Sequence, residues 1–487
     1  MKDLDALRLD NSYARLHPAF HEVVDPTPLP NPKLVAFSDA AARLIDLDPA
    51  AAQDPRLLAV LAGARRLPGS EPVAAIYAGH QFGVWVPQLG DGRAILLGET
   101  VNDRGERWDL QLKGAGQTRF SRMGDGRSVL RSAIREHLIS EAMAALGIPT
   151  TRSLAVVGSD EVVYRETPET AATLLRLAPS HVRFGTFQLF ASRGQTDRIR
   201  ELAEHVIGQH HPELVGEEDR VRRWLGTVVE RTARLVADWM AVGWAHGVLN
   251  TDNMSVLGVT LDYGPYGFQD DFDPHFICNH TDHAGRYAYD QQPAVGLWNL
   301  ARFAEALLSL ITEDEANQAL SGYPAAFDRR YGELMRAKLG LTRAEDDDRD
   351  FLGSSLAFLA THRVDYTRFW RRLADVWLGP GVPDSLRPLV ADQDALAAWL
   401  AGYRARAERD PRPPQERRAA ILAANPKYVL RNYLAQQAIE KATEGDFQEV
   451  DRLGRVLSRP FDEQPEHERY ADQPPPWARE IVVSCSS

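Results

Sequence analysis

Residues 246–264 hold the side chains best suited to chemistry. Two acids and an amide, Asp252, Asn253 and Asp262, flank a small predicted hairpin around Gly258. Carboxylate and amide oxygens are ligands that Mg²⁺ prefers, with substrate phosphates completing the set. Solvated acids on a surface turn are the alternative, but the order of helix, hairpin and Asp-aromatic-Gly favours a metal loop. We expect a site for Mg²⁺, or for Mn²⁺, which shares these ligands.

The same stretch resembles the catalytic and metal-binding loops of protein kinases and small-molecule kinases. Asn253 matches their metal-binding Asn, and Asp262-Tyr263-Gly264 matches their Asp-Phe-Gly. One position departs from the pattern, because His246-Gly247 is followed by Val248 where a kinase carries its catalytic Asp. By kinase rules the chain is a pseudokinase, and Asp252 is left as the candidate base.

A lysine and a glutamate upstream could hold ATP phosphates. Lys113 ends an alternating run from Trp108, which predicts a strand with one polar face. Glu136 shares a predicted helix row with small or apolar residues, so it should face inward and require a cation. Two solvated side chains are the alternative. With the metal loop present, we expect Lys113 to pair with Glu136, as the strand lysine and helix glutamate of kinases do.

Two glycine-rich turns and two arginines are further candidates for contacts to phosphate. The turn Gly90-Asp91-Gly92-Arg93 precedes a short apolar strand, and Gly124-Asp125-Gly126 leads into a helix whose predicted N-cap is Ser128. A plain turn is the alternative at each place, since a lone G-x-G is weak evidence. Arg176 and Arg183 suit bidentate phosphate contacts, although either could pair with a surface acid.

The elements that must position these residues predict an α+β fold of two kinase-like lobes. Strands dominate early, with one helix over 129–146 and a hairpin predicted to turn at Gly158-Ser159-Asp160. From residue 183 the pattern turns helical, with a long buried helix ending near Gly243. We expect an N-terminal extension (1–70), an N-lobe (71–178), a C-lobe core with the catalytic and metal loops (179–310), and a helical extension with a flexible tail (311–487).

Composition limits the partners and the compartment. The chain has 487 residues, with 68 Asp plus Glu against 56 Lys plus Arg, giving a net charge of −12. Such a chain repels phosphate backbones, so nucleic acid is not an expected partner. Charged residues interrupt each apolar run that could cross a membrane, and the first ten residues resemble neither a signal nor a transit peptide. We therefore expect a cytoplasmic protein with no membrane partner, acting as a monomer.

Over nearly its full length the chain resembles the selenoprotein O family. The resemblance rests on long motifs: NSYARL from Asn11, YAGHQFGVWVPQLGDGRA from Tyr77, DLQLKGAGQTRFSR from Asp109, GRSVLRSAIREHL from Gly126, APSHVRFGTFQ from Ala178, HGVLNTDNMS from His246, LDYGPYGF from Leu261 and NPKYVLRNYLAQ from Asn425. Eukaryotic members carry selenocysteine third from the end. Cys485 stands at that position here.

The resemblance implies a kinase-like fold that binds ATP in a flipped orientation. It implies transfer of AMP, not phosphate, to Ser, Thr or Tyr hydroxyls of proteins, with release of pyrophosphate. The implied roles are nucleotide binding by Gly90, Gly92, Arg93, Lys113, Asp125, Gly126, Arg176, Arg183 and Asp262, with Glu136 supporting Lys113, metal binding by Asn253 and Asp262, and proton acceptance by Asp252. A kinase that transfers the γ-phosphate and an inactive nucleotide-binding scaffold are the competing functions.

The resemblance also gives the two cysteines a possible role. Two cysteines exclude a disulfide framework, and on the residues alone Cys278 and Cys485 read as unrelated thiols. Cys278 lies in the position of a kinase activation segment, and Cys485 lies near the end of the predicted tail. A disulfide between them would tether the tail over the active site and make the enzyme responsive to redox conditions.

Overall fold

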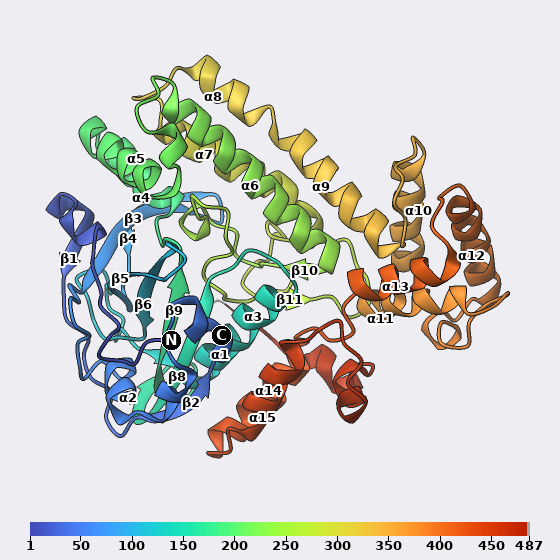
Figure 1. Ribbon diagram of the computed structural model, residues 1–487, viewed down its shortest axis with the longest axis horizontal. Coiled ribbons are helices and arrows are strands. Elements are labelled where there is room, and N and C mark those ends of the chain that lie inside the picture. The colour runs from blue at the N-terminus through green and yellow to red at the C-terminus, as the bar shows by residue number, and fades with distance from the viewer. Residues whose placement is uncertain (485–487) are drawn as a thin grey trace.

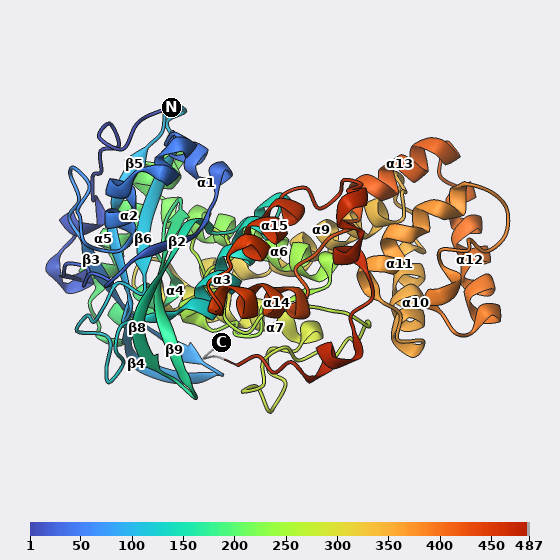
Figure 2. The ribbon, with the colours of Figure 1, turned by 90° about the horizontal axis from the view of Figure 1, so that it is seen from below.

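The computed structural model describes residues 1–484 and shows a mixed α+β protein (Figure 1). A large antiparallel sheet lies at one end, and helices α10 to α13 lie at the other, as Figure 2 shows. The strands are β1 (His21–Val23), β2 (Lys33–Phe37), β3 (Val73–Gln81), β4 (Val84–Gly90), β5 (Ala94–Val101), β6 (Arg107–Lys113), β7 (Ser128–Val129), β8 (Arg152–Tyr164), β9 (Pro168–Ala178), β10 (Trp244–Ala245) and β11 (Gly267–Phe268).

The helices lie both at the sheet end of the molecule and toward its far end (Figure 1). They are α1 (Asp39–Leu44), α2 (Pro55–Leu61), α3 (Leu130–Ala145), α4 (Phe184–Ser192), α5 (Thr196–His210), α6 (Arg220–Val242), α7 (Gln292–Ala306), α8 (Glu313–Leu320), α9 (Tyr323–Lys338), α10 (Asp348–Thr361), α11 (Tyr366–Arg372), α12 (Gln393–Glu408), α13 (Pro414–Ala424), α14 (Asn432–Thr443) and α15 (Gln448–Leu457).

The main sheet has nine strands, paired in the order β1-β3-β5-β6-β9-β8-β2, with β4 added to β3 and β7 to β9. The alternation predicted in β6 is present. Leu110 and Leu112 face an apolar cluster on one side of the sheet, whereas Gln111 and Lys113 face the opposite side. At β6, one face of the sheet therefore packs against an apolar core, and the other face carries polar side chains.

The N-terminal extension is built into this sheet. It supplies β1 and β2, and its leucines pack against Leu110 and Leu112 to form a core cluster separate from that of the helices. The proline-rich segment 25–32 is held by Arg127, whose Nη1 and Nη2 donate to the carbonyl oxygens of Thr27 (2.8 Å) and Pro28 (3.1 Å). Residues 1–70 thus supply the two end strands of the sheet order and part of the apolar cluster on one of its faces.

The prediction of a hairpin turn at Gly158-Ser159-Asp160 is wrong. Strand β8 runs through these residues with a shift in register between Gly158 and Val162, and the chain reverses only at residues 165–167. A Cβ added to Gly158 would lie 3.1 Å from a methyl of Val35 in β2. Glycine here permits a bulge and a close strand approach, which give the same sequence signal as a turn.

The helical region follows the predicted periodicity. Helix α6 ends at Val242, and Gly243 takes a left-handed conformation (φ +76°) as its C-cap. Helices α14 and α15 lie beside α3 in both views, so the last helices return to the sheet end (Figures 1 and 2). In the residues that the structure describes, no helix is long and apolar enough to cross a membrane.

Candidate nucleotide-binding and catalytic site

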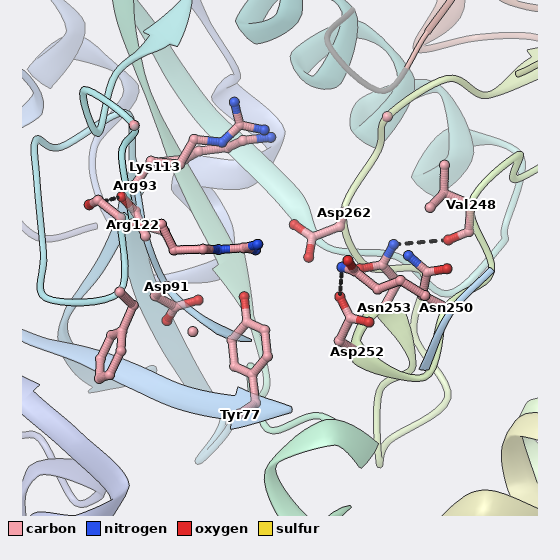
Figure 3. A pocket seen from close by; sticks show the side chains of 18 of the residues that line it. Tyr77, Asp91, Arg93, Lys113, Arg122, Val248, Asn250, Asp252, Asn253 and Asp262 are labelled. Atoms are coloured by element: carbon pink, nitrogen blue, oxygen red, sulfur yellow. Dashed lines mark hydrogen bonds between the residues drawn. The ribbon is translucent and has the colours of Figure 1, made fainter. Parts of the chain in front are cut away.

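One cavity of about 780 Å³ gathers most of the predicted side chains (Figure 3). Among the described residues, seven cationic side chains and four carboxylates line it. The cations are Arg93, Lys113, Arg122, Arg127, Arg165, Arg176 and Arg183, and the carboxylates are Asp91, Asp125, Asp252 and Asp262. In Figure 3, Tyr77, Asp91 and Lys113 lie on one side, and Asp252, Asn253 and Val248 lie opposite. An excess of cations in a concave site favours a polyanion such as a nucleoside triphosphate.

Lys113 and Arg176 share the carboxylate of Glu136. Lys113 Nζ donates to one oxygen, and Arg176 Nε donates to the other at 2.5 Å. Burial alone would raise the pKa of Glu136, but Arg176 and Lys113 outweigh it and hold that pKa below its usual value. Burial lowers the pKa of Lys113 to about 8. The ion pair expected from the helix row is present, and Glu136 lies behind the two cations, outside the cavity lining.

Arg183 and Arg176 both reach Asp262. Arg183 Nη1 donates to Asp262 Oδ2 and, at 2.8 Å, to the carbonyl oxygen of Asp252, while Arg176 Nη2 lies 2.6 Å from Asp262 Oδ1. Burial opposes ionisation of Asp262, yet the arginines hold its pKa well below the usual range. Asp262 has a left-handed backbone (φ +55°), which Asp tolerates better than most residues. The two predicted arginines therefore converge on one carboxylate.

The hairpin predicted around Gly258 is largely absent. It is reduced to a single antiparallel bridge between Met254 and Thr260. Gly258 turns with φ +68°, and a Cβ there would lie 2.6 Å from the Cβ of Arg231 in α6. The loop packs onto that helix instead of forming a ladder, because the backbone approaches α6 too closely for a side chain. The turn still brings Asp262 back toward Asn253.

Asn253 is oriented by the residue that replaces the kinase acid. Its Nδ2 donates to the carbonyl oxygen of Val248 at 2.9 Å, so its Oδ1 remains available as a ligand. His246 is buried and its Nε2 lies 3.1 Å from the carbonyl oxygen of Leu261, which ties the two halves of the loop together. The described residues contain no cluster of three or more His, Cys, Asp or Glu side chains suited to a metal.

Asp252 is a buried carboxylate with an unused acceptor. Gln81 Nε2 donates to its Oδ2 at 3.2 Å, whereas Oδ1 has no hydrogen-bond partner among the described residues. Strand β3 lies against it so closely that a Cβ on Gly79 would come 2.7 Å from Oδ1. Burial raises the pKa of Asp252 to about 6. A carboxylate with this pKa is ionised near neutral pH and retains affinity for a proton, as a general base requires.

The turn Gly90–Arg93 joins β4 to β5 at the cavity edge. A Cβ on Gly90 or Gly92 would come within 2.5 or 2.8 Å of Phe120, so both positions need glycine. The carbonyl oxygen of Arg93 accepts from the amide of Gly114, which places Arg93 beside Lys113. No carboxylate of the described chain lies within ion-pair distance of the Arg93 guanidinium, so it can bind an external anion.

The second glycine-rich turn, Gly124-Asp125-Gly126, lines the cavity but does not lead directly into a helix as predicted. Ser128 does not cap α3, because it belongs to β7 and pairs with Ala172 of β9. Gly124-Asp125-Gly126 is therefore not a helix N-terminus. Asp125 and Gly126 still line the cavity, and both oxygens of Asp125 accept from Arg165, at 2.7 and 3.0 Å.

Sequence reasoning missed several lining residues, among them Tyr77, Gln81 and Asn250. Tyr77 stacks beneath the Arg183 guanidinium, 5.0 Å from the ring centroid. Asn250 Oδ1 accepts from the amide of Phe82 at 3.1 Å, which joins the catalytic loop to the end of β3. Their signal was present in the motifs from Tyr77 and His246, where polar residues are dense. Nothing in those letters shows which of them face the cavity.

Cys278 lies beside the loop, as its position in the chain suggested. Its Sγ donates to the carbonyl oxygen of Pro265 at 2.8 Å, and a Cβ on Gly247 would come 2.6 Å from that sulfur. The amide of His280 donates to the carbonyl oxygen of Val483, so the C-terminal segment runs past this region. Cys485 lies outside the described residues, and its pairing with Cys278 stays a prediction.

Comparison with known proteins agrees with a nucleotide-handling enzyme. A family described as protein adenylyltransferase SelO matches residues 4–458. Relatives named protein nucleotidyltransferase YdiU, from Thioalkalivibrio sulfidiphilus, Myxococcus xanthus and Thiobacillus denitrificans, are 56%, 55% and 54% identical, over 100% of both chains in each case. The chain is therefore an enzyme that transfers nucleotidyl groups from ATP. It belongs to the protein adenylyltransferase SelO family.

Proposed function

We propose that this protein transfers AMP from ATP to Ser, Thr or Tyr hydroxyls of other proteins on a kinase-like, two-lobed scaffold. The observation that carries the proposal is the cavity, where a cation-rich wall faces Asp252, Asn253 and Asp262. Membership of the adenylyltransferase family supports the same reaction. In this arrangement the sheet region is the N-lobe, and the helices from α4 onward build the C-lobe and its extension.

The cationic wall binds the triphosphate. Lys113, Arg176 and Arg183 neutralise it from inside, Arg93 reaches it from the rim, and the glycine turns let the backbone approach. Glu136 positions Lys113 and Arg176 without touching the nucleotide. Pyrophosphate leaves with more negative charge than ADP would leave with if the γ-phosphate were transferred. Several fixed cations lower the free-energy cost of its release.

Asn253 and Asp262 are the proposed metal ligands, with Mg²⁺ or Mn²⁺ as the ion. The donor set fits these ions. The Asn253 side chain uses its Nδ2 for the hydrogen bond to Val248, which leaves Oδ1 available, and Asp262 offers an ionised carboxylate. A bound divalent cation would add charge neutralisation at the phosphates. Asp262 must exchange part of its contact with Arg176 and Arg183 for this role, and the incoming phosphates supply the arginines with new partners.

Asp252 is the proposed base. The acceptor hydroxyl oxygen forms a bond to the α-phosphorus, the bond between that phosphorus and the bridging oxygen of the β-phosphate breaks, and pyrophosphate leaves with the electron pair. The hydroxyl proton passes to the Asp252 carboxylate, which lines the cavity and whose Oδ1 packs against β3. Gln81 holds the other oxygen and so fixes the orientation of the carboxylate.

Transfer of the γ-phosphate is the second candidate, and Val248 argues against it. A kinase places its acid at that position, whereas the base available here lies further along the loop. An inactive scaffold is the third candidate, and the retained Lys113, Glu136, Asn253 and Asp262 argue against it. We also propose a cytoplasmic monomer, which sedimentation and fractionation would check.

Position-specific labelling of ATP separates the three candidates. The protein is incubated with Mg²⁺, an acceptor protein mixture and ATP labelled on either the α- or the γ-phosphate. Protein-bound α-label alone supports AMP transfer, γ-label alone a kinase, and neither label an inactive scaffold. Asp252→Asn should retain ATP binding and lose label transfer, since it removes the base without changing the shape of the side chain. Undiminished transfer by this variant would remove Asp252 from the mechanism.

A further inference from the structure

A second cavity, of about 640 Å³, opens beside the first, and we call it the acceptor groove. Its lining includes Phe82, Thr281, Asp282, His283, Arg286 and Trp298. Phe82 and Thr281 line both cavities. Because the residue before Phe82 is Gln81, which donates to Asp252, the acceptor groove begins next to the proposed base. A molecule lying in it would have one end at the reacting carboxylate.

Arg286 is a cation without a carboxylate partner in this groove. Its guanidinium lies between the turn at Gly83, where a Cβ would come 3.2 Å from Cζ, and the ring of Trp298, whose centroid is 4.6 Å away. Two acids lie four residues from Arg286 in sequence. Asp282, which lines the groove, accepts from the backbone amides of Arg286 (3.0 Å) and Tyr287 (2.7 Å), and Asp290 pairs with His275 at 2.7 Å. Among the described residues, no carboxylate lies within ion-pair distance of the Arg286 guanidinium.

The neighbours of Arg286 on the Trp298 ring are basic side chains. Arg302 stacks on the same Trp298 ring at 5.4 Å, although its charge is balanced by Glu305 at 2.5 Å. His80 packs edge-on against Trp298, 5.2 Å between centroids. Burial lowers the pKa of His80, and Arg302 and Arg286 lower it further, as expected where the local potential is positive. In a chain with net charge −12, this end of the groove therefore favours an anionic partner.

We propose that the acceptor groove binds an extended segment of the protein substrate, and that Arg286 recognises an acidic side chain near the modified hydroxyl. This inference rests on the proposed AMP transfer. The modified residue points toward Asp252, and its neighbours run past Phe82 and Thr281 to Arg286. An arginine held flat by Trp298 loses little freedom when it binds a carboxylate, so it can select among acceptors.

Peptide libraries test the proposal directly. Peptides with a central Ser, Thr or Tyr and acidic, neutral or basic flanks are incubated with α-labelled ATP and the full-length protein. The native protein should label acidic-flanked peptides in preference to the others. Arg286→Gln should raise the KM for acidic peptides about three- to tenfold, the range expected for one partly exposed charge pair, and leave the KM for ATP unchanged.

Two further variants make the test specific. Arg302→Gln is the matched control, because Arg302 stacks on the same ring and already has a carboxylate partner, so the flank preference should persist. Arg286→Glu should shift the preference toward basic flanks. Native protein that labels all flanks equally, or a preference that survives Arg286→Gln, would overturn this inference alone. If no acceptor takes α-label, the proposed AMP transfer fails, and the inference fails with it.

Discussion

Two buried arginine–aspartate clusters serve different ends in this molecule. In the cavity, Arg183 and Arg176 hold Asp262. At the junction of the helical extension, Arg431 holds Asp365, with both oxygens 2.9 Å from its Nη2, and also Asp270 at 2.5 Å. The chemistry of the ion pairs is the same, and each arginine is almost fully buried, with 2 to 3% of its side chain exposed.

The difference lies in what surrounds each cluster. Asp262 lines a cavity with further cations, so its arginines can pass to an incoming phosphate. Arg431 precedes α14, Asp365 caps α11, and Asp270 follows β11, so that cluster joins three chain segments. A buried ion pair is therefore no sign of function by itself. A cavity with surplus cations beside the pair is the feature that marks the site.

The largest effect should come from Asp262→Asn. It removes a proposed metal ligand and the charge facing the phosphates, and we expect AMP transfer to fall on the order of a thousandfold. The unfolding free energy should change by less than about 2 kcal/mol, because Asn tolerates the left-handed backbone and Arg176 keeps Glu136. Label transfer and urea unfolding measure the two quantities. Near-native transfer would refute the metal assignment.

The matched variant in the other cluster is Asp365→Asn. Asn still caps α11, so the change isolates the charge, and Arg431 is left buried with only the more exposed Asp270. We expect a loss of about 3 kcal/mol in the free energy of unfolding. Activity per folded molecule should be unchanged. An activity loss as large as that of Asp262→Asn, without loss of stability, would break the distinction between the two clusters.

The smallest effect concerns Lys338, a buried cation that has no ion-pair partner among the described residues. Its Nζ lies 5.4 and 6.0 Å from the ring centroids of Tyr366 and Trp370, and burial lowers its pKa to about 7. Between about pH 7 and pH 10.5, Lys338 is protonated in the unfolded chain and neutral in the folded protein. Charged Lys338 therefore lowers the free energy of unfolding. This cost is fully present below about pH 7 and falls as the pH rises through the window.

Lys338→Met should therefore raise the free energy of unfolding by about 1–2 kcal/mol at pH 6, with the gain shrinking toward pH 10. Urea unfolding at several pH values measures the difference between variant and native protein. The exposed Lys441, changed to Met in parallel, should show no such trend. A gain that grows with pH would mean that Lys338 is stabilised in its charged form.

Much of the fold was predictable because its elements carry strong local signals. Helix α6 has a continuous apolar stripe and a terminal glycine, and β6 alternates strictly. The two wrong hairpins, at Gly158 and Gly258, share one cause. A glycine between β-type residues marks either a turn or a close backbone approach, and only the neighbour that approaches, β2 or α6, decides between them.

The site was predictable to the extent that residue type limits its chemistry. Lys113 and Glu136 were paired in advance, because an inward glutamate needs a cation. The sequence could not show that Arg176 shares Glu136, or that Glu136 stands outside the cavity. Those contacts depend on the register of β9 against β6, which is a long-range property of the sheet.

The sequence by itself determined the inventory: a lysine on a strand, a glutamate on a helix, Asn253 and Asp262 around a turn, and Val248 in place of a kinase acid. These depend on residue identity and local periodicity, which the chain carries without folding. Only the tertiary structure decided that Asp262 meets two arginines, that Asp252 is buried beside Gly79, and that a second groove with Arg286 opens next to it. Burial and charge balance arise from segments far apart in the chain, so no local pattern encodes them.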